Sequence, residues 1–600
     1  MKRSRAVAAL AFAAVACGGA QPRLTLFSTN WQDDRGTSIA RVWETIERVP
    51  IPAAADVVVG VAQRGDALIG LPISGARASR WTVSHALDAR PVVAGNVVVG
   101  SGGGEVFAVD AATGQMVWRC PSGSLPLVGA GDDGAITVAT FDQAGGLGSV
   151  LLAVRHDGEV IRRIETDKAL GAPAVVGHLA FVPWAGQYVS VIDLASGDEA
   201  ARVTLRQQMS HAWTQAQSLW FGQLGFTRFD QRISLASSGG ATMTTVLASD
   251  LPGTPTLMPP GVTPLPAAAN AGDKVRLYAR PAATDSAVSM SDGRFYATYF
   301  RVAMGFEVTG TKIDWVHVRA ADFLGGGAGV GAVVLCDEQG KVVALDGKSG
   351  GILAEMDLGQ PLRACVVNVD AARPAGGTPV AKPLAAQLED AVRVDDPTIT
   401  TAQRFLLREL AAVDDPSATK TLIDVASDPR ASPDLVADAR TALAKRRNGQ
   451  TFMETALERH FDFLKDVLSG PPVGPIAVAL GAMKERTAAP LLAAHLLDPN
   501  DTADDVKQTA AALAVVGGSD ELLAMRQFFG MYRANAEDDD VAAAVVSIAE
   551  ALLASTDKGA REEVEAAAND SRTVPYARER LVQMLAAEQL DAGLAPSVAK

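Results

Sequence analysis

The sequence predicts a multidomain β + α protein, in which a seven- to eight-bladed β-propeller is followed by an α-solenoid of stacked helix pairs. A strand-rich unit recurs in the first part of the chain at separations of about 30 to 45 residues, the length of one four-stranded blade. From Leu384 the pattern changes to periodic Leu, Ala and Val, which is typical of amphipathic helices. All eight Trp precede residue 320, and from Leu384 onward 35 acidic and 22 basic side chains give a net charge near −13, against −14 for the whole chain.

The clearest copy of the repeat is residues 96–118, NVVVGSGGGEVFAVDAATGQMVW. It predicts a strand, a glycine turn, a second strand that ends at Asp110, a turn at Gly114 and a third strand closed by Trp118. Asp can accept hydrogen bonds from turn amides, and Gly adopts the positive φ that the turn requires. A second clear copy is residues 342–352, and we expect each closing Trp to pack between neighbouring blades. Weaker copies are centred on residues 67–71, 151–155, 189–193, 227–230 and 304–307.

These residues resemble the pyrroloquinoline-quinone-type propeller repeat over roughly residues 55–370. That family includes quinone-dependent dehydrogenases and non-enzymatic members such as the BamB-like lipoproteins of the outer-membrane β-barrel assembly machinery. The dehydrogenases hold their cofactor between a Trp and a disulfide of adjacent cysteines, beside a calcium ion. The cysteines of this chain, Cys17, Cys120, Cys336 and Cys365, are not adjacent, and no loop offers the six to eight oxygen ligands of calcium. The resemblance therefore implies the propeller without a cofactor or a metal ion.

The first residues predict export and lipidation. Three basic side chains within residues 2–5 precede the apolar run 6–16, which is too short to span a bilayer and is typical of a secretory signal. Residues 14–17, AVAC, resemble a bacterial lipobox, so we expect a signal peptide at 1–16 and a lipid on Cys17. The alternative is an ordinary signal peptidase site. Because Gly18 follows the cysteine, the expected location is the bacterial outer membrane, lipid-anchored on the periplasmic side.

Four segments outside the two main domains are expected. Residues 17–54 are predicted to form a tether, with a strand at 24–28 that closes the ring and a short helix at 38–49. The Pro-rich insertion 237–273 is either a long surface loop or an arm that contacts a partner. Residues 371–383 have the composition of a linker. Residues 591–600 are predicted to be a flexible tail.

The second domain is predicted to span residues 384–590. Its clearest part, 475–530, contains helix pairs at a spacing of about 40 residues and resembles HEAT repeats. The alternative is an irregular helical bundle. Residues 538–540, three consecutive Asp, are interpreted as a helix start and not as a metal site.

Candidate catalytic residues are few, and we predict none. The seven His show no zinc-ligand spacing. Gly347–Gly351 fits a GxSxG pattern, but it lies at a hairpin turn, so Ser349 is interpreted as a turn residue and not as a nucleophile. Cys336 and Cys365 are expected either to form a disulfide or to be two buried thiols, and the distance between their Cα atoms decides.

The function predicted from these observations is a non-enzymatic scaffold that faces the periplasm and binds other envelope proteins through the propeller and the acidic solenoid. By the family resemblance, the sharper hypothesis is a role in outer-membrane protein assembly or envelope maintenance. The chain lacks the basic surface that nucleic acids require. The alternatives are a quinone-dependent dehydrogenase-like enzyme and a small-molecule sensor that binds its ligand in the propeller funnel.

Overall fold

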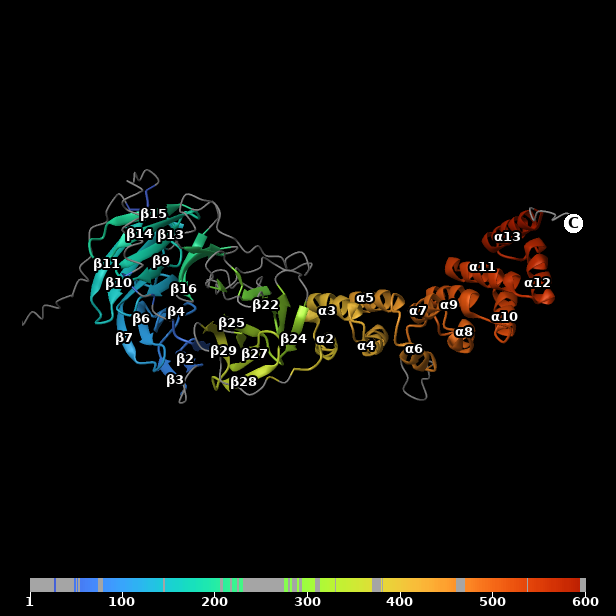
Figure 1. The fold of residues 1–600 in the computed structure, drawn as a ribbon, viewed down its shortest axis with the longest axis horizontal. Helices are drawn as coiled ribbons and strands as arrows, with labels where there is room; N and C mark the ends of the chain where they lie inside the picture. Colours follow the sequence, from blue (N-terminus) through green and yellow to red (C-terminus); the bar gives the residue numbers. More distant parts are fainter. Residues whose placement is uncertain are drawn as a thin grey trace, which may run out of the picture. The chain divides into compact units, whose positions relative to one another are not determined.

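The computed structural model divides the chain into two compact units, Met1–Lys382 and Pro383–Lys600, called here the β-sheet unit and the helical unit (Figure 1). Residues 54–369 and 381–593 are described with internal gaps, together with 26–28, 48–49, 51 and 379. The gaps are 74–78, 144–145, 205–208, 216–217, 224–225, 230–274, 279–280, 283–288, 291–293, 308–312, 330, 460–469 and 537. Predictions for Cys17, for the Pro-rich insertion 237–273 and for most of the tether, linker and tail lie outside the described residues.

The described part of the β-sheet unit consists of antiparallel sheets, six with four strands, one with three and one with two. Its strands are β1 (Val57–Ala62), β2 (Ala67–Pro72), β3 (Trp81–Ser84), β4 (Val92–Ala94), β5 (Val97–Gly102), β6 (Glu105–Asp110), β7 (Met116–Pro121), β8 (Leu127–Asp132), β9 (Ile136–Asp142), β10 (Ser149–Arg155), β11 (Val160–Thr166), β12 (Ala174–Val176), β13 (Leu179–Trp184), β14 (Tyr188–Asp193), β15 (Glu199–Thr204), β16 (Met209–Gln215), β17 (Ser218–Gln223), β18 (Phe226–Phe229), β19 (Val275–Tyr278), β20 (Pro281–Ala282), β21 (Ser289–Met290), β22 (Arg294–Tyr299), β23 (Val302–Glu307), β24 (Ile313–Val318), β25 (Phe323–Gly329), β26 (Ala332–Asp337), β27 (Lys341–Asp346), β28 (Ile352–Asp357) and β29 (Leu362–Asn368).

The four-stranded sheets formed by consecutive strands are meanders, such as β4–β7 and β25–β28. Successive sheets meet through their first strands, since β4 lies beside β8, β8 beside β12 and β12 beside β16. Residues on both faces of these inner strands are buried. The arrangement is that of a propeller-like fold, as predicted.

The first and last strands of the β-sheet unit pair with each other. β29 is hydrogen-bonded to β1, with Val57 opposite Asn368 and Gly60 opposite Cys365. β29 also packs on β25 of the preceding sheet and on β4 of the following one. The expected closing strand at 24–28 is therefore wrong: of these residues 26–28 are described, and they form a turn. Phe27 in that turn packs edge-on against Trp184, because a buried ring contact takes the place of backbone pairing.

The repeat motif produces the turns that the sequence predicts. In the β6–β7 turn, the Asp110 carboxylate accepts from the N–H groups of Ala112 (3.1 Å) and Thr113 (2.8 Å), and Gly114 has φ 71°. The same turn recurs between β27 and β28, where Asp346 accepts from Lys348 and Ser349 and Gly350 has φ 68°.

Tryptophans join neighbouring sheets, as predicted. The indole N–H of Trp81 in β3 donates to Ala111 in the next sheet, and that of Trp315 in β24 donates to Gly347 in the next described four-stranded sheet, both at 2.9 Å. Each ring lies against the turn glycine of the neighbouring sheet. A Cβ added to Gly114 or Gly350 would lie 2.7 Å from the indole, so these positions need glycine for space as well as for φ.

The helical unit is an alternating stack. Its α-helices are α2 (Leu384–Val392), α3 (Thr400–Ala412), α4 (Pro416–Ser427), α5 (Pro433–Ala444), α6 (Gln450–Leu457), α7 (Val473–Met483), α8 (Ala489–Leu496), α9 (Ala503–Val516), α10 (Leu522–Tyr532), α11 (Asp539–Ala554), α12 (Lys558–Asn569) and α13 (Pro575–Gly593), with short 3₁₀ turns at Pro397–Ile399 and Arg486–Ala488. The odd-numbered helices α3 to α13 pack on one another in order, and the even-numbered helices α2 to α10 form a second row. None of the described helices combines the length and apolar character needed to cross a membrane.

Side-chain caps start several of these helices. Asp415 begins α4, Thr502 begins α9 and Asp557 begins α12, each by accepting a hydrogen bond from a backbone N–H of the first turn. Asp538 caps α11 in the same way, in agreement with the interpretation of residues 538–540 as a helix start.

Candidate functional site

The predicted cysteine pair lies where the β-sheet unit closes. Cys336 in β26 and Cys365 in β29 are joined in a disulfide, with their Cα atoms 6.7 Å apart, within the range that a bridge can span. The bond links the last four-stranded sheet to the strand that pairs with β1. Cys120 is buried and lies outside this bridge.

Ser349 is part of a turn. Its hydroxyl donates to the Asp346 carboxylate at 2.9 Å, and its own N–H donates to the same oxygen. The next element is strand β28, whereas a hydrolase nucleophile sits between a strand and a helix.

A cavity of about 140 Å³ lies among the inner strands β4, β8, β12, β16 and β29. Its wall is mainly Val, Ala, Gly and Pro, and its polar side chains are Arg90, Asp132, His211, Trp213, Thr214 and Asn368. Two of these are committed to the wall, since Arg90 donates to the Leu324 and Cys365 carbonyls and Asn368 donates to the Ala55 carbonyl. Burial lowers the pKa of His211 to about 4, so this imidazole is neutral at physiological pH. The cavity is therefore suited to a small apolar molecule and not to a charged one.

A second histidine in the β-sheet unit is paired with a buried carboxylate. His156 Nε2 lies 2.7 Å from Asp132, which also accepts from the Gly134 N–H and the Thr137 hydroxyl. The hydrogen bond to Asp132 raises the pKa of His156, and burial opposes it. Thr137 is itself held by the indole N–H of Trp118 at 3.1 Å. These bonds join two turns of one sheet to the preceding sheet, which is a structural role.

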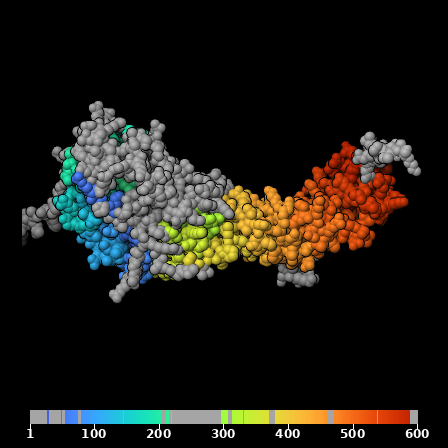
Figure 2. Space-filling model, in the orientation of Figure 1, coloured from blue at the N-terminus to red at the C-terminus, as the bar shows by residue number. Residues whose placement is uncertain are grey.

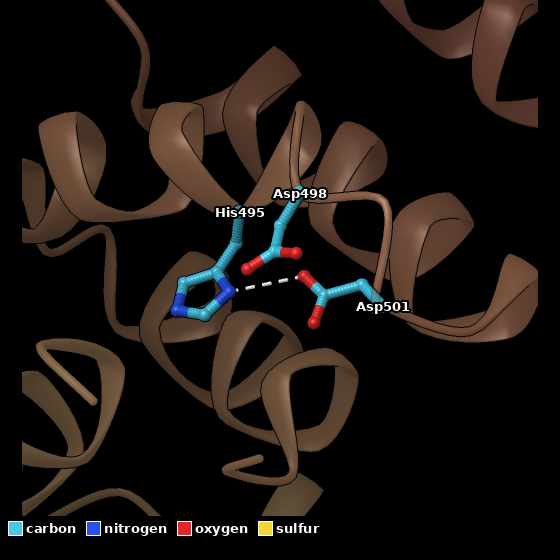
Figure 3. A group of neighbouring side chains, drawn as sticks. All are labelled: His495, Asp498 and Asp501. Carbon is cyan, nitrogen blue, oxygen red and sulfur yellow. Dashed lines mark hydrogen bonds and ion pairs between the residues drawn. The ribbon is translucent and has the colours of Figure 1, made fainter. Parts of the chain in front are cut away.

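The helical unit contains a group of three side chains that sequence reasoning missed (Figure 3). His495 lies in the last turn of α8, and Asp498 and Asp501 lie in the loop before α9. His495 Nδ1 is 3.0 Å from Asp501 Oδ2, and His495 Nε2 is 2.9 Å from the Leu457 carbonyl oxygen. Ligand atoms of all three residues lie within 4.8 Å of one another. Only 1% of the His495 side chain and 10% of the Asp501 side chain are exposed.

The signal that could have revealed this group is the spacing His-x-x-Asp-x-x-Asp across a helix end. The zinc pattern that we searched for places its histidines within one helix. A loop that folds back toward its own helix brings together residues six positions apart, which helical periodicity alone does not predict.

No protein-family model and no curated protein matches the chain. Among solved structures, it is similar to BamB from Moraxella catarrhalis, with 14% identity and a TM-score of 0.28 over 52% of this chain and 85% of that one. It is also similar to AztD from Citrobacter koseri, with 11% identity and a TM-score of 0.30 over 53% of this chain and 98% of that one. A computationally designed protein, Ika8, gives 11% identity and a TM-score of 0.31 over 54% and 92%. With TM-scores this low, the description of the fold depends on the strand pairing given above.

Proposed function

We propose that this chain is a non-enzymatic, lipid-anchored scaffold on the periplasmic side of the bacterial outer membrane, which binds other envelope proteins. Cys17 is the proposed lipidation site. In this proposal the β-sheet unit is a seven-bladed propeller, and the helical unit is a HEAT-like α-solenoid. The seven described sheets of three or four strands support the first statement, and the two rows of alternating helices support the second.

The observation that carries the proposal is the number of large apolar side chains exposed on the helical unit. Leu523 is 69% exposed, Val515 and Met531 are each 56% exposed, Tyr576 is 52% exposed and Val582 is 51% exposed. They belong to α9, α10 and α13, in the orange-to-red part of the surface in Figure 2. Exposed apolar side chains among acidic ones are typical of surfaces that bind proteins.

The test is crosslinking in the native envelope, followed by purification of the chain and mass spectrometry. We expect wild type to be crosslinked to a component of the β-barrel assembly machinery, and the double variant Leu523→Asp/Met531→Asp to lose that crosslink. Leu147→Asp is the matched control, because Leu147 is 74% exposed but lies in the β-sheet unit. Absence of any assembly component from the wild-type crosslinks would remove the assembly role. Equal crosslinking by the double variant would remove the helical surface from the proposal.

The anchor is tested separately, by mass spectrometry of the mature amino terminus. We expect an acylated Cys17 in wild type and an unacylated, released chain for Cys17→Ser. A wild-type chain that begins without an acyl group would contradict the proposed location.

The inner cavity supports a second candidate, a sensor of a small apolar molecule. A ligand at 100 times its dissociation constant would stabilise the β-sheet unit by about 2.7 kcal/mol. A thermal-shift screen with small apolar compounds tests this candidate. A screen in which no compound raises the melting temperature would count against it.

A further inference from the structure

Three turns of the helical unit have the same backbone structure, and the His–Asp group lies in one of them. They follow α4, α8 and α12 and contain Asp428, Asp498 and Asp570 respectively. In each turn this Asp side chain accepts from the N–H two residues later, at 2.9, 2.9 and 3.0 Å. In each, the Asp N–H donates to the carbonyl three residues earlier, and the Asp carbonyl accepts from the N–H three residues later. The first Asp of the group is thus explained by the turn.

His495 and Asp501 are not explained by the turn. They stand three residues before and three residues after Asp498. The equivalent positions are Val425 and Ala431 in the first turn, and Ala567 and Thr573 in the third. Since the same backbone hydrogen bonds form with those side chains, the turn needs neither the imidazole nor the second carboxylate.

The tautomer of His495 directs a lone pair at the carboxylates. The Leu457 carbonyl can only accept, so the Nε2 atom that lies 2.9 Å from it carries a hydrogen. In the neutral ring Nδ1 then has its lone pair exposed toward Asp501 Oδ2, 3.0 Å away (Figure 3). Two lone pairs at that separation repel unless a cation lies between them, and the cation is either a proton or a metal ion.

We propose that His495 Nδ1, Asp498 and Asp501 bind a divalent metal ion of the zinc class. One imidazole nitrogen and two carboxylate oxygens are a donor set that Zn²⁺ accepts, with bonds of about 2.0 to 2.2 Å and ligand atoms slightly more than 3 Å apart. The Leu457 carbonyl is the kind of outer partner that orients a metal-binding histidine. A cavity of about 220 Å³, lined also by Gly470, Pro471 and Asn500, leaves room for a water molecule at the fourth position. The ion would tie the end of α8 to the loop before α9 and, through Leu457, to α6.

The test is zinc titration of the full-length chain after chelator treatment, with a chromophoric chelator as competitor. We expect one zinc equivalent whose affinity falls at least 100-fold in His495→Ala and in Asp501→Asn. Asp428→Asn is the matched control, because it removes the same turn bond where no histidine is present, and we expect it to bind as wild type does. Far-ultraviolet circular dichroism of each variant checks that the helices remain folded.

A second measurement is independent of the variants' folding. Cobalt added to the wild-type chain should give the visible absorption of a four- or five-coordinate site, and added zinc should abolish it. If wild type binds no zinc, or binds it as tightly as both folded variants do, the cation at this position is a proton and the proposal is overturned.

Discussion

The two units of this chain are stabilised in different ways. In the β-sheet unit, the strand at one end of the sequence pairs with the strand at the other, so Val57 lies opposite Asn368. In the helical unit, the ion pairs between helices join residues 33 to 37 positions apart, such as Arg404 with Asp438 and Lys507 with Asp540. A closed ring is lost as a whole, whereas a stack of repeats depends on nearest neighbours and can open from its ends. We therefore expect cooperative unfolding of the first unit and graded unfolding of the second.

The largest predicted effect is on the contact between sheets. Trp315 is fully buried, and Trp315→Ala removes both its ring packing and its bond to Gly347. We expect a loss of about 3 to 5 kcal/mol in the unfolding free energy of the β-sheet unit. The fluorescence of the remaining tryptophans, all in that unit, measures it, while helical circular dichroism should follow an unchanged second transition. A shift of both transitions would contradict the separation of the units.

Removal of the disulfide is predicted to have the next largest effect. The bridge closes a loop with a sequence separation of 29, and a loop of this size contributes about 3 to 4 kcal/mol. Cys336→Ser/Cys365→Ser should lower the unfolding free energy of the β-sheet unit by that order. Intact-mass measurement with and without reductant checks that the bond is present.

Cys120→Ser is the control for this pair, since Cys120 lies outside the bridge. If reductant leaves the wild-type denaturation midpoint unchanged, the bond contributes nothing to the closure.

Arg446 tests the helical unit. This buried guanidinium donates to the carbonyls of Ala411, Val413 and Asp415 at 2.8 to 2.9 Å, and so joins α5 to the connection between α3 and α4. Arg446→Ala leaves these acceptors unpaired, and we expect a loss of about 3 kcal/mol, seen in helical circular dichroism alone. Arg447→Ala, at the exposed neighbouring position, should change stability by less than about 0.5 kcal/mol. Equal losses for the two variants would show that the clamp has no role.

The smallest predicted effect is that of pH on the β-sheet unit. The bond to Asp132 raises the pKa of His156 in the folded state, so its contribution is complete below the ordinary histidine pKa. That contribution is lost as pH rises through the raised folded value. The unfolding free energy should therefore decrease from mildly acidic to alkaline pH, and His156→Gln should flatten the decrease. His178→Gln, at a more exposed histidine, should keep the wild-type slope, and a steeper slope in His156→Gln would reverse the sign of the argument.

The sequence predicted what depends on local chemistry. The Asp110 turn, the Trp81 and Trp315 contacts and the change from strands to helices near Leu384 follow from residue types at fixed spacings. What it did not predict depends on the path of the chain through space. The partner of β1 is some 300 residues away, and its pairing residues carry no mark that distinguishes them from other Val-rich strands.

The candidate metal site was missed for a related reason. His495 and Asp501 meet only because the loop after α8 turns back, and the third contributor, the Leu457 carbonyl, is a backbone atom of another helix. Backbone ligands and orienting groups leave no residue type to search for.

Hydrogen exchange of the native chain tests the central claim most directly, namely that strand β29 closes the β-sheet unit. The account predicts that amides of β1 and β29 have the same high protection as the central strand β6, because they are released only when the whole unit opens. It also predicts that protection in the helical unit falls toward α2 and α13. Fast exchange in β1 and β29, with β6 still protected, would contradict it.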